Sequence, residues 1–188
     1  MLKRCDFVTI KVEEYFLKED KDIMKIVVTS DTHIKTIAKK PLPEKLREAC
    51  KQADLIIHAG DWQTPEVYEE LNQYAPVKGV WGNTDAEDIK QYVSDQAIVE
   101  AAGYRIGIVH GHGDTKTTEQ RVKATFQDEE VSLDIVIFGH SHIAYMRYMG
   151  KTLFLNPGSP TDKRRSPYYS FAVLNLAEDI QCDFIYFS

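Results

Sequence analysis

The stretch Leu55-Ile56-Ile57-His58-Ala59-Gly60-Asp61-Trp62 shows the pattern that decides the fold, a short apolar run that ends abruptly at a glycine and a carboxylate. Short runs of apolar and β-branched residues predict buried β-strands. Four more runs (26–28, 77–81, 106–109 and 135–138) lead into Ser30-Asp31-Thr32-His33, Gly82-Asn83-Thr84-Asp85, His110-Gly111-His112-Gly113 and Gly139-His140-Ser141-His142. Because ligands of open α/β sheets bind beyond the carboxyl ends of the strands, we expect these turns to form one site.

The histidines sharpen this expectation, because all six lie at these strand ends: His33, His58, His110, His112, His140 and His142. A single histidine in such a place is well explained by chance. Six together, beside Asp31, Asp61 and Asn83, form a set of metal-ligand side chains. One carboxylate can bridge two cations, and Asp61 is the candidate for that role. The sequence therefore predicts a centre that holds two metal ions.

The composition is that of a globular protein of one domain. The chain has 188 residues, 43% hydrophobic and 28% charged, which is enough for an ordinary core. No apolar run approaches the roughly 20 residues that span a bilayer, and the first residues lack the apolar core of a signal peptide. Cys5, Cys50 and Cys182 are scattered, which predicts free thiols in a reducing compartment. We expect a cytoplasmic protein that does not bind membranes.

The charge balance limits the partners. The formal net charge is −6, from 23 basic and 29 acidic residues, and such a surface repels polyanions. Strong non-specific binding of nucleic acid is therefore not expected. A small phosphate ester stays acceptable, because bound cations would invert the local charge. The oligomeric state stays open, and a homo-oligomer is one alternative.

Residues 1–23 form a charge-rich N-terminal extension, and the predicted domain covers residues 24–188. Met24 stands directly before the first predicted strand, so the extension is expected to be an extended translation start or a loosely docked arm. A functional arm that contacts a partner is the third alternative. No candidate ligand and no predicted strand lie in the extension. Its deletion should therefore leave folding and activity nearly unchanged.

Strands and helices alternate after Met24, which predicts parallel strands at the core of a sheet. Helices are expected at about 44–51, 65–74 and 117–126, with Thr64 as a candidate N-cap of the second. Two runs flank Ala102-Gly103, which indicates a hairpin. Only short strands are expected after His142, and their antiparallel arrangement suggests a second sheet packed on the first.

The order of the polar turns resembles a known family. It is Asp-x-His, Gly-Asp, Gly-Asn-x-Asp, His-Gly-His and Gly-His-x-His, and it is similar to the calcineurin-like metallophosphoesterase superfamily. The later segment Asn156-Pro157-Gly158-Ser159 looks like the compact bacterial and archaeal phosphodiesterase branch of that family. The resemblance covers about residues 24–188. It implies an α/β fold with two facing mixed β-sheets, a β-sandwich flanked by helices.

The resemblance also implies a ligand set. The first metal would take Asp31, His33, Asp61 and His142, and the second would take Asp61, Asn83, His110 and His140. Imidazole, carboxylate and amide ligands together suit borderline divalent cations more than Ca²⁺. We expect two divalent ions, with Mn²⁺ first and Ni²⁺, Zn²⁺, Fe or Co²⁺ as alternatives.

By the same resemblance, the activity is that of a metal-dependent phosphodiesterase or phosphoesterase, which attacks with a metal-bound hydroxide. The residues expected to act in catalysis are Asp61, Asn83 and His112. Substrate contacts are expected from Asn83, Arg164 and Arg165, with a solvated basic loop as the alternative for the two arginines. His58 is expected to be structural or to support the ligands.

The chain departs from the family at Thr84, where many members carry a histidine that protonates the leaving group. This departure leaves the general acid unidentified. Two other functions stay open on the same fold, a phosphomonoesterase and a non-catalytic interaction scaffold like the retromer subunit. A nuclease is disfavoured, because the chain has neither the length nor the basic charge to hold nucleic acid. The physiological substrate and the native metal are not decided by the sequence.

Overall fold

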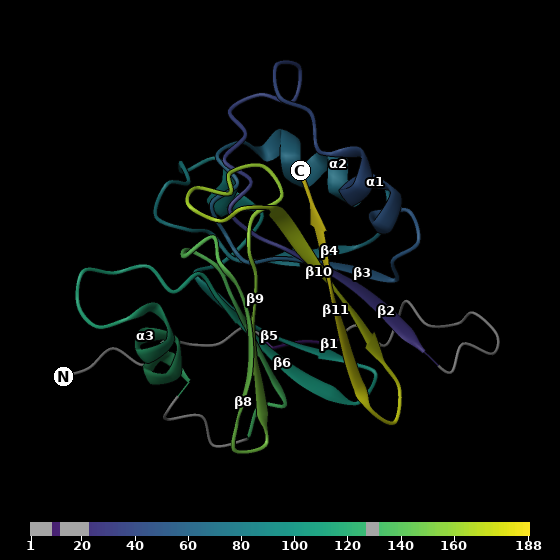
Figure 1. Ribbon diagram of the computed structural model, residues 1–188, viewed down its shortest axis with the longest axis vertical. Helices are drawn as coiled ribbons and strands as arrows, with labels where there is room; N and C mark the ends of the chain where they lie inside the picture. Colours follow the sequence, from purple (N-terminus) through teal and green to yellow (C-terminus); the bar gives the residue numbers. More distant parts are fainter. Residues whose placement is uncertain (1–8, 12–22, 127–131) are drawn as a thin grey trace.

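Two mixed β-sheets face each other across an apolar core, with helices on their outer sides (Figure 1). The computed structural model describes residues 9–11, 23–126 and 132–188. The first sheet has the order β11-β10-β2-β3-β4, with β2 (Met24–Thr29), β3 (Leu55–His58), β4 (Val77–Gly79), β10 (Tyr169–Leu176) and β11 (Ile180–Phe187). The predicted fold class is confirmed.

The second sheet has the order β1-β5-β6-β7-β9-β8. Its strands are β1 (Thr9–Lys11), β5 (Gln96–Ala101), β6 (Tyr104–Val109), β7 (Ile135–Phe138), β8 (Ala144–Met149) and β9 (Thr152–Pro157). Strands β2, β3 and β4 are parallel in one sheet, and β6, β7 and β9 are parallel in the other. The turns that follow β2, β3, β4, β6 and β7 carry the candidate ligands, as predicted.

Alternation along the strands explains the layers. In β2, Ile26 and Val28 enter the core between the sheets, whereas Val27 packs with the helices on the outer side. Successive side chains of a strand point to opposite faces, so a strand covered on both faces is apolar throughout. This is why the run in β3 contains no polar residue before His58.

The three α-helices among the described residues begin close to the positions predicted from the sequence. Helix α1 (Glu44–Cys50) and helix α2 (Pro65–Asn72) cover the first sheet, and helix α3 (Thr118–Thr125) covers the second (Figure 1). The Thr64 side chain caps α2 by accepting the Glu66 backbone N–H, and Thr117 forms a capping box with Gln120 at α3. A short 3₁₀ turn, η2 (Ile89–Gln91), follows the turn after β4. Among the described residues, no helix has the length and apolar character needed to cross a membrane.

The late strands do not form a second sheet of their own, which corrects the simple expectation. Strands β8 and β9 extend the second sheet beside β7, whereas β10 and β11 extend the first beside β2. The second sheet begins earlier, with the hairpin of β5 and β6 around the predicted turn Ala102-Gly103. The reason is that each late hairpin pairs with the free edge of a parallel sheet.

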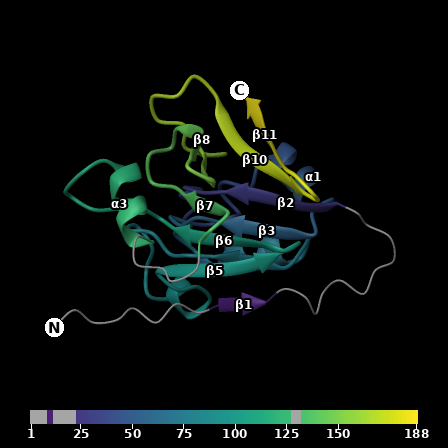
Figure 2. The same cartoon turned by 90° about the horizontal axis from the view of Figure 1, so that it is seen from below.

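The N-terminal extension contributes a strand that the sequence did not predict. Residues Thr9–Lys11 form β1, which pairs in parallel with Ile98 to Glu100 of β5 at the edge of the second sheet (Figure 2). The other positions of the predicted extension, 1–8 and 12–22, lie outside the described residues. A docked edge strand agrees with the arm alternative, and the domain boundary at residue 24 stays a prediction.

Deletion of residues 1–23 should therefore lower the melting temperature by a few degrees without changing metal-dependent turnover. The deletion removes the pairing of β1 with β5 but no candidate ligand. Thermal melting by circular dichroism and activity at a fixed metal concentration measure both effects. An unchanged melting temperature would show that β1 adds nothing to stability, and lost turnover would show that the extension reaches the site.

Candidate metal centre

The backbone of the predicted ligand turns is unusual. Asp31, His33, Asp61, His140 and His142 all have positive φ, between 45° and 69°. Residues other than glycine rarely adopt this left-handed conformation, and such strain clusters at functional sites. Each turn thus bends sharply after its strand, which directs successive side chains to one place.

Six of the predicted ligands form two groups whose ligand atoms lie within 4.8 Å of one another. One group is Asp31, His33 and His142, and the other is Asp61, His110 and His140. Asp31, Asp61, His110 and His142 are buried, whereas His33 and His140 are partly exposed. The residues come from four separate turns, which follow strands of both sheets. The centre therefore lies at the end of the sandwich where the carboxyl ends of these strands meet. Each group could hold a metal ion.

Asp61 lies between the two groups. Its Oδ2 is 3.3 Å from His110 Nε2 and 3.5 Å from His33 Nε2. Its Oδ1 accepts the backbone N–H of Thr84 at 2.9 Å, which fixes the orientation of the carboxylate. The second carboxylate, Asp31, has Oδ1 at 3.3 Å from His142 Nε2 and accepts the backbone N–H of His140.

Tautomers show why this arrangement suits a cation. His110 Nδ1 lies 2.7 Å from the Ala59 carbonyl oxygen, which can only accept, so a neutral ring carries its proton on Nδ1. Nε2 then points an unshared pair at Asp61 Oδ2, and it has no hydrogen-bond partner among the described residues although it is buried. His142 is oriented in the same way by the Asp162 carbonyl oxygen. Two facing electron pairs repel each other unless a cation or a proton lies between them.

The pKa values of the groups agree with this chemistry. Burial alone would raise the pKa of Asp61, but the His110 imidazole and the Thr84 N–H hold it well below its usual range. Burial opposes ionisation of His110, yet Asp61 and Asp31 raise its pKa above the usual value. Burial lowers the pKa of His140 to about 4, which leaves a neutral ring at neutral pH. Metal binding needs such deprotonated ligands.

Two glycines explain the Gly-Asn and Gly-His motifs. A Cβ at Gly82 would lie 2.2 Å from Asp61 Oδ1, and a Cβ at Gly139 would lie 2.0 Å from Ser30 Oγ. Any larger residue would displace a candidate ligand or the hydroxyl that donates to Asp31. The motif glycines are therefore required for close approach of the turns.

Asn83 and Thr84 form the open side of the centre, where both are exposed. Asn83 Oδ1 lies 3.1 Å from His140 Nδ1, which places the amide beside the second group as predicted. Thr84 Oγ1 lies 3.4 Å from His33 Nδ1. Thr84, where the resemblance led us to expect a histidine, therefore lies beside a candidate ligand of the first group.

The two extra histidines differ. His58 is fully buried, stacks on Trp62 at 3.6 Å, and lies 3.2 Å from Thr32 Oγ1 through its Nε2. Burial lowers the pKa of His58 to about 3, so it is a neutral residue that supports the turns. His112 lies next to His110, with ring centroids 5.6 Å apart, and its buried Nδ1 has no hydrogen-bond partner among the described residues. Burial and the charge of His110 lower its pKa.

The two arginines predicted to contact the substrate lie at the surface. Arg164 Nε is 3.9 Å from Asp162 Oδ2, and Asp162 in turn holds His142 through its carbonyl oxygen. Arg165 is exposed in the same loop. Their role in substrate binding stays a prediction.

Arg121 of α3 was not predicted from the sequence, although it holds the loop that carries His112. Its Nε donates to the Gly111 carbonyl at 2.9 Å, and its terminal nitrogens donate to Thr115, Lys116 and Thr118. Nothing in the helical run around Arg121 distinguishes it from a solvated cation. Only the folded loop shows its role.

Asp85 also has a role that the sequence did not show. Its Oδ2 accepts the backbone N–H groups of Asp61 at 3.0 Å and Gly82 at 2.8 Å. Its Oδ1 accepts the Gln63 N–H at 2.7 Å. One carboxylate thus joins the turn of the central Asp61 to the turn of Asn83.

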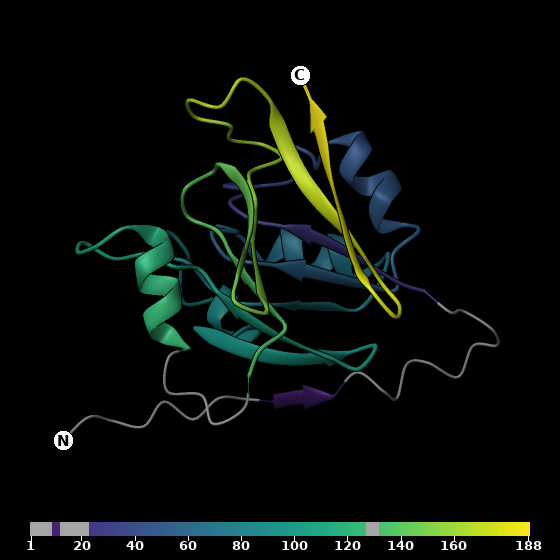
Figure 3. The ribbon, with the colours of Figure 1, turned by 60° about the horizontal axis from the view of Figure 1, so that its bottom comes forward.

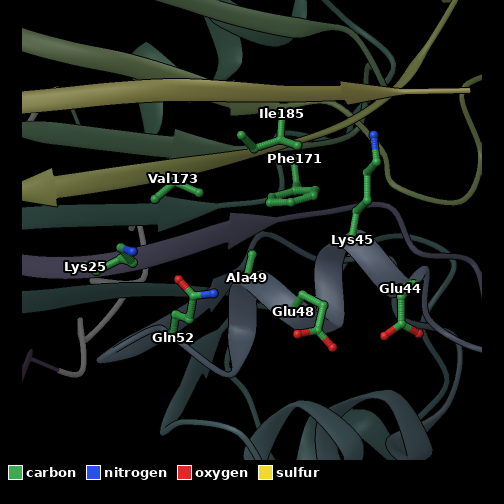
Figure 4. A pocket seen from close by; sticks show the side chains of 9 residues that line it. All are labelled: Lys25, Glu44, Lys45, Glu48, Ala49, Gln52, Phe171, Val173 and Ile185. Carbon is green, nitrogen blue, oxygen red and sulfur yellow. The ribbon is translucent and has the colours of Figure 1, made fainter.

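A separate groove lies away from this centre, between α1 and the outer face of β10 and β11 (Figure 4). Phe171, Val173 and Ile185 form its apolar wall, and Glu44, Lys45 and Glu48 lie on the α1 side. Its lining contains none of the candidate ligands. This groove is therefore separate from the candidate metal centre.

The two-sheet fold, with paired His–Asp groups at the carboxyl ends of its strands, is that of a metallophosphoesterase. A family model described as the calcineurin-like phosphoesterase superfamily domain matches residues 24–179. The chain belongs to the calcineurin-like phosphoesterase superfamily, as the order of its motifs indicated.

Individual relatives agree with this assignment. A probable metallophosphoesterase of Methanothermobacter thermautotrophicus is 35% identical over 144 residues, which cover 75% of this chain and 80% of the relative. A phosphodiesterase of Methanocaldococcus jannaschii is 28% identical over 152 residues, which cover 72% and 83%. The crystal structure of wild-type Vps29 from Entamoeba histolytica, complexed with zinc, has a TM-score of 0.64 at 21% identity and covers 88% of this chain and 100% of that chain. This last likeness shows the fold alone.

Asp85→Asn should weaken metal binding while the protein stays folded. The amide can accept through one oxygen only, and its NH₂ group would face a backbone N–H, so the turn of Asp61 would lose a hydrogen bond. Loss of a group that orients metal ligands typically lowers metal affinity roughly 10–100-fold. Calorimetric titration with Mn²⁺ measures the change. Asp88→Asn is the matched control, because Asp88 only caps η2, and equal affinities of the two variants would contradict the role of Asp85.

Proposed function

We propose that the chain is a metal-dependent phosphodiesterase that hydrolyses a small or accessible phosphate ester. The observation that carries the proposal is the position of Asp61 Oδ2, within 3.5 Å of a histidine from each group. A shared carboxylate oxygen supports two cations in one centre. Membership of the phosphoesterase superfamily supports ester hydrolysis, and the M. jannaschii relative named a phosphodiesterase supports a diester substrate.

The proposal assigns a ligand set to each cation. Asp31, His33 and His142 would hold one, Asn83, His110 and His140 would hold the other, and Asp61 would be shared between them. Two divalent cations held by these residues would polarise the phosphate oxygens and lower the pKa of the attacking water. Mn²⁺ is proposed first, because the mixture of imidazole, carboxylate and amide suits borderline cations.

The residues of the chain would orient the reaction. Thr84 N–H fixes the carboxylate of Asp61, and Asn83 lies exposed at the open side, where its amide can contact a phosphate oxygen. The pKa of His112 is lowered, which keeps its ring mostly neutral near pH 7, so His112 is a poor proton donor at that pH. His112 would instead orient the substrate. The exposed Arg164 and Arg165 remain proposed contacts for the part of the ester that extends beyond the centre.

The proposed localisation and partners rest on the free thiols and on the net charge of the chain. Cys50 and Cys182 are free thiols, which supports a reducing compartment such as the cytoplasm. The net charge of −6 disfavours tight non-specific binding of nucleic acid, whereas a small phosphate ester stays acceptable because bound cations would invert the local charge.

A non-catalytic scaffold is the second candidate, because Vps29 shares the fold. The Vps29 of Entamoeba histolytica was itself complexed with zinc, so metal binding alone does not separate the two functions. Turnover does. A metal-reconstituted panel of phosphomonoesters and phosphodiesters tests the proposal, and absence of metal-dependent hydrolysis of every ester would favour the scaffold. Hydrolysis restricted to monoesters would favour a phosphomonoesterase.

Asp61→Asn should lower both metal content and turnover more than Asp31→Asn does. The first change weakens both proposed sites, and the second weakens one. Elemental analysis after equilibration with Mn²⁺, together with rates on an activated aryl phosphodiester, measures the two effects. Asp179→Asn, in the turn between β10 and β11, is the control and should keep both. Equal losses in the two ligand variants, with metal retained in each, would contradict the shared role of Asp61.

Hydrolysis should depend steeply on the acidity of the leaving group. A positioned general acid typically contributes about 10²–10⁴-fold when the leaving oxygen is basic, and Thr84 has no usable acidity near neutral pH. Activated aryl diesters should therefore react far faster than alkyl diesters. Thr84→His should flatten this dependence by raising the rates of poor leaving groups, and Thr84→Val is the control for lost hydroxyl contacts. A shallow slope in the unmodified protein would show that another acid is present.

A further inference from the structure

One side of the sandwich exposes apolar side chains. Of the large hydrophobic residues that are exposed in the described part of the chain, five lie on or beside the hairpins β8–β9 and β10–β11: Ile143, Met146, Tyr148, Tyr168 and Tyr186. Met146 is 47% exposed, Tyr148 55% and Tyr186 52%. We call the surface formed by Met146, Tyr148, Phe184 and Tyr186 the open edge.

The open edge continues the two inner faces of the sandwich. In β8, Met146 pairs with Leu155 and Tyr148 with Leu153, and both leucines lie in the core between the sheets. In β11, Phe184 pairs with Ala172 of the same core. Its neighbour Ile185 points to the opposite face, into the groove beside α1 (Figure 4). Met146, Tyr148 and Tyr186 are thus left exposed where the sheets end, and Phe184 beside them is only partly covered by the core.

The strands that carry this surface are both sheet edges. Strand β8 ends the second sheet and β11 ends the first, and the hairpins of the two strands diverge from each other (Figure 3). Edge strands are usually protected by proline, by several charges or by a bulge. Strand β8 has no proline and a single charge, Arg147. An unprotected edge next to exposed apolar residues is a template on which another strand can pair.

We propose that the chain forms a two-fold symmetric dimer in which β8 of each copy pairs antiparallel with β11 of the other. Strand β9 runs parallel to β7, so β8 runs against the strands that lead to the metal centre, whereas β11 runs with them. A two-fold axis along the strands keeps these directions opposed. Both sheets then continue from one copy into the next, and both metal centres lie at the same end of the dimer.

Charge complementarity indicates that the partner at the open edge is a second copy of this chain. Arg147 of β8 and Asp183 of β11 are both exposed, and neither makes an ion pair with another described residue. If Arg147 lies opposite Asp183 of the second copy, Met146 lies opposite Phe184 and Ala144 opposite Tyr186. Apolar residues then face apolar residues on the inner side, and unlike charges face each other on the outer side. Opposite charges and aromatic pairs in these positions stabilise neighbouring strands.

Symmetry doubles these contacts. In a two-fold interface each copy gives its β8 to the β11 of the other, so the same pairs form twice and neither of these two strands is left to recruit a third copy. The dimer therefore closes, and an open chain of copies is not expected. None of the residues of the open edge is a candidate metal ligand, and the inference does not rest on the proposed hydrolysis.

Sedimentation velocity of the full chain over a range of concentrations tests the dimer. The unmodified protein should sediment with twice the mass of one chain, and Tyr148→Glu should give a monomer with an unchanged circular dichroism spectrum. Tyr92→Glu is the control, because Tyr92 is also an exposed tyrosine, at 45%, but lies in the segment after β4. A monomer at every concentration of the unmodified protein would overturn the proposal.

Charge exchange tests the pairing itself. Arg147→Asp and Asp183→Arg should each weaken the dimer, and the two changes together should restore it. A dimer that resists both single changes and Tyr148→Glu would use another surface and would overturn the proposal. Failure of the double variant to restore association would overturn the register of Arg147 against Asp183. Species larger than a dimer would contradict the closed two-fold arrangement.

Discussion

The contact of one carboxylate, that of Asp61, with histidines of two groups is the constraint on which the rest of the structure depends. His110 and His33 come from different sheets, and each places Nε2 within 3.5 Å of Asp61 Oδ2. The backbone of Asp61 is left-handed, with φ of 60°. Its position is held by the N–H of Thr84 on one side and by the carboxylate of Asp85 on the other. Buried lone pairs and negative charges gathered in this way are costly unless a cation joins them.

The architecture brings these side chains together from distant parts of the chain. Parallel strands in each sheet end at the same edge, and the facing sheets bring the two edges into one mouth. Asp31 and the backbone of His140 are 109 positions apart, yet they share a hydrogen bond. Glycines at the motif turns permit the approach, since a side chain at Gly139 would collide with Ser30. The core of the sandwich and the N-terminal caps of α2 and α3 help to hold these turns in their relative positions.

Much of this was predictable, because it depends on local pattern. The apolar runs that end at Asp31, Asp61 and His110 predicted the strands and their polar ends, and Thr64 predicted the start of α2. The features that could not be predicted depend on contacts between residues that are far apart in the sequence. Three features leave no periodic signal in the sequence. They are the sheet edge on which β8 and β10 each pair, the presence of strand β1, and the hydrogen bonds that Asp85 and Arg121 make to the backbone. The exposed arginines of the loop after β9 show the same limit, since a flexible cation near a site has the same pattern as a solvated one.

The most direct test of the shared carboxylate is electron paramagnetic resonance of the protein loaded with Mn²⁺. Two Mn²⁺ ions joined through Asp61 are close enough to couple their spins. We predict two ions per chain and an exchange-coupled spectrum, which should be absent in Asp61→Asn. The spectrum of isolated Mn²⁺ in the unmodified protein loaded with two ions per chain would contradict the account, because it would show that the two groups of ligands do not form one centre.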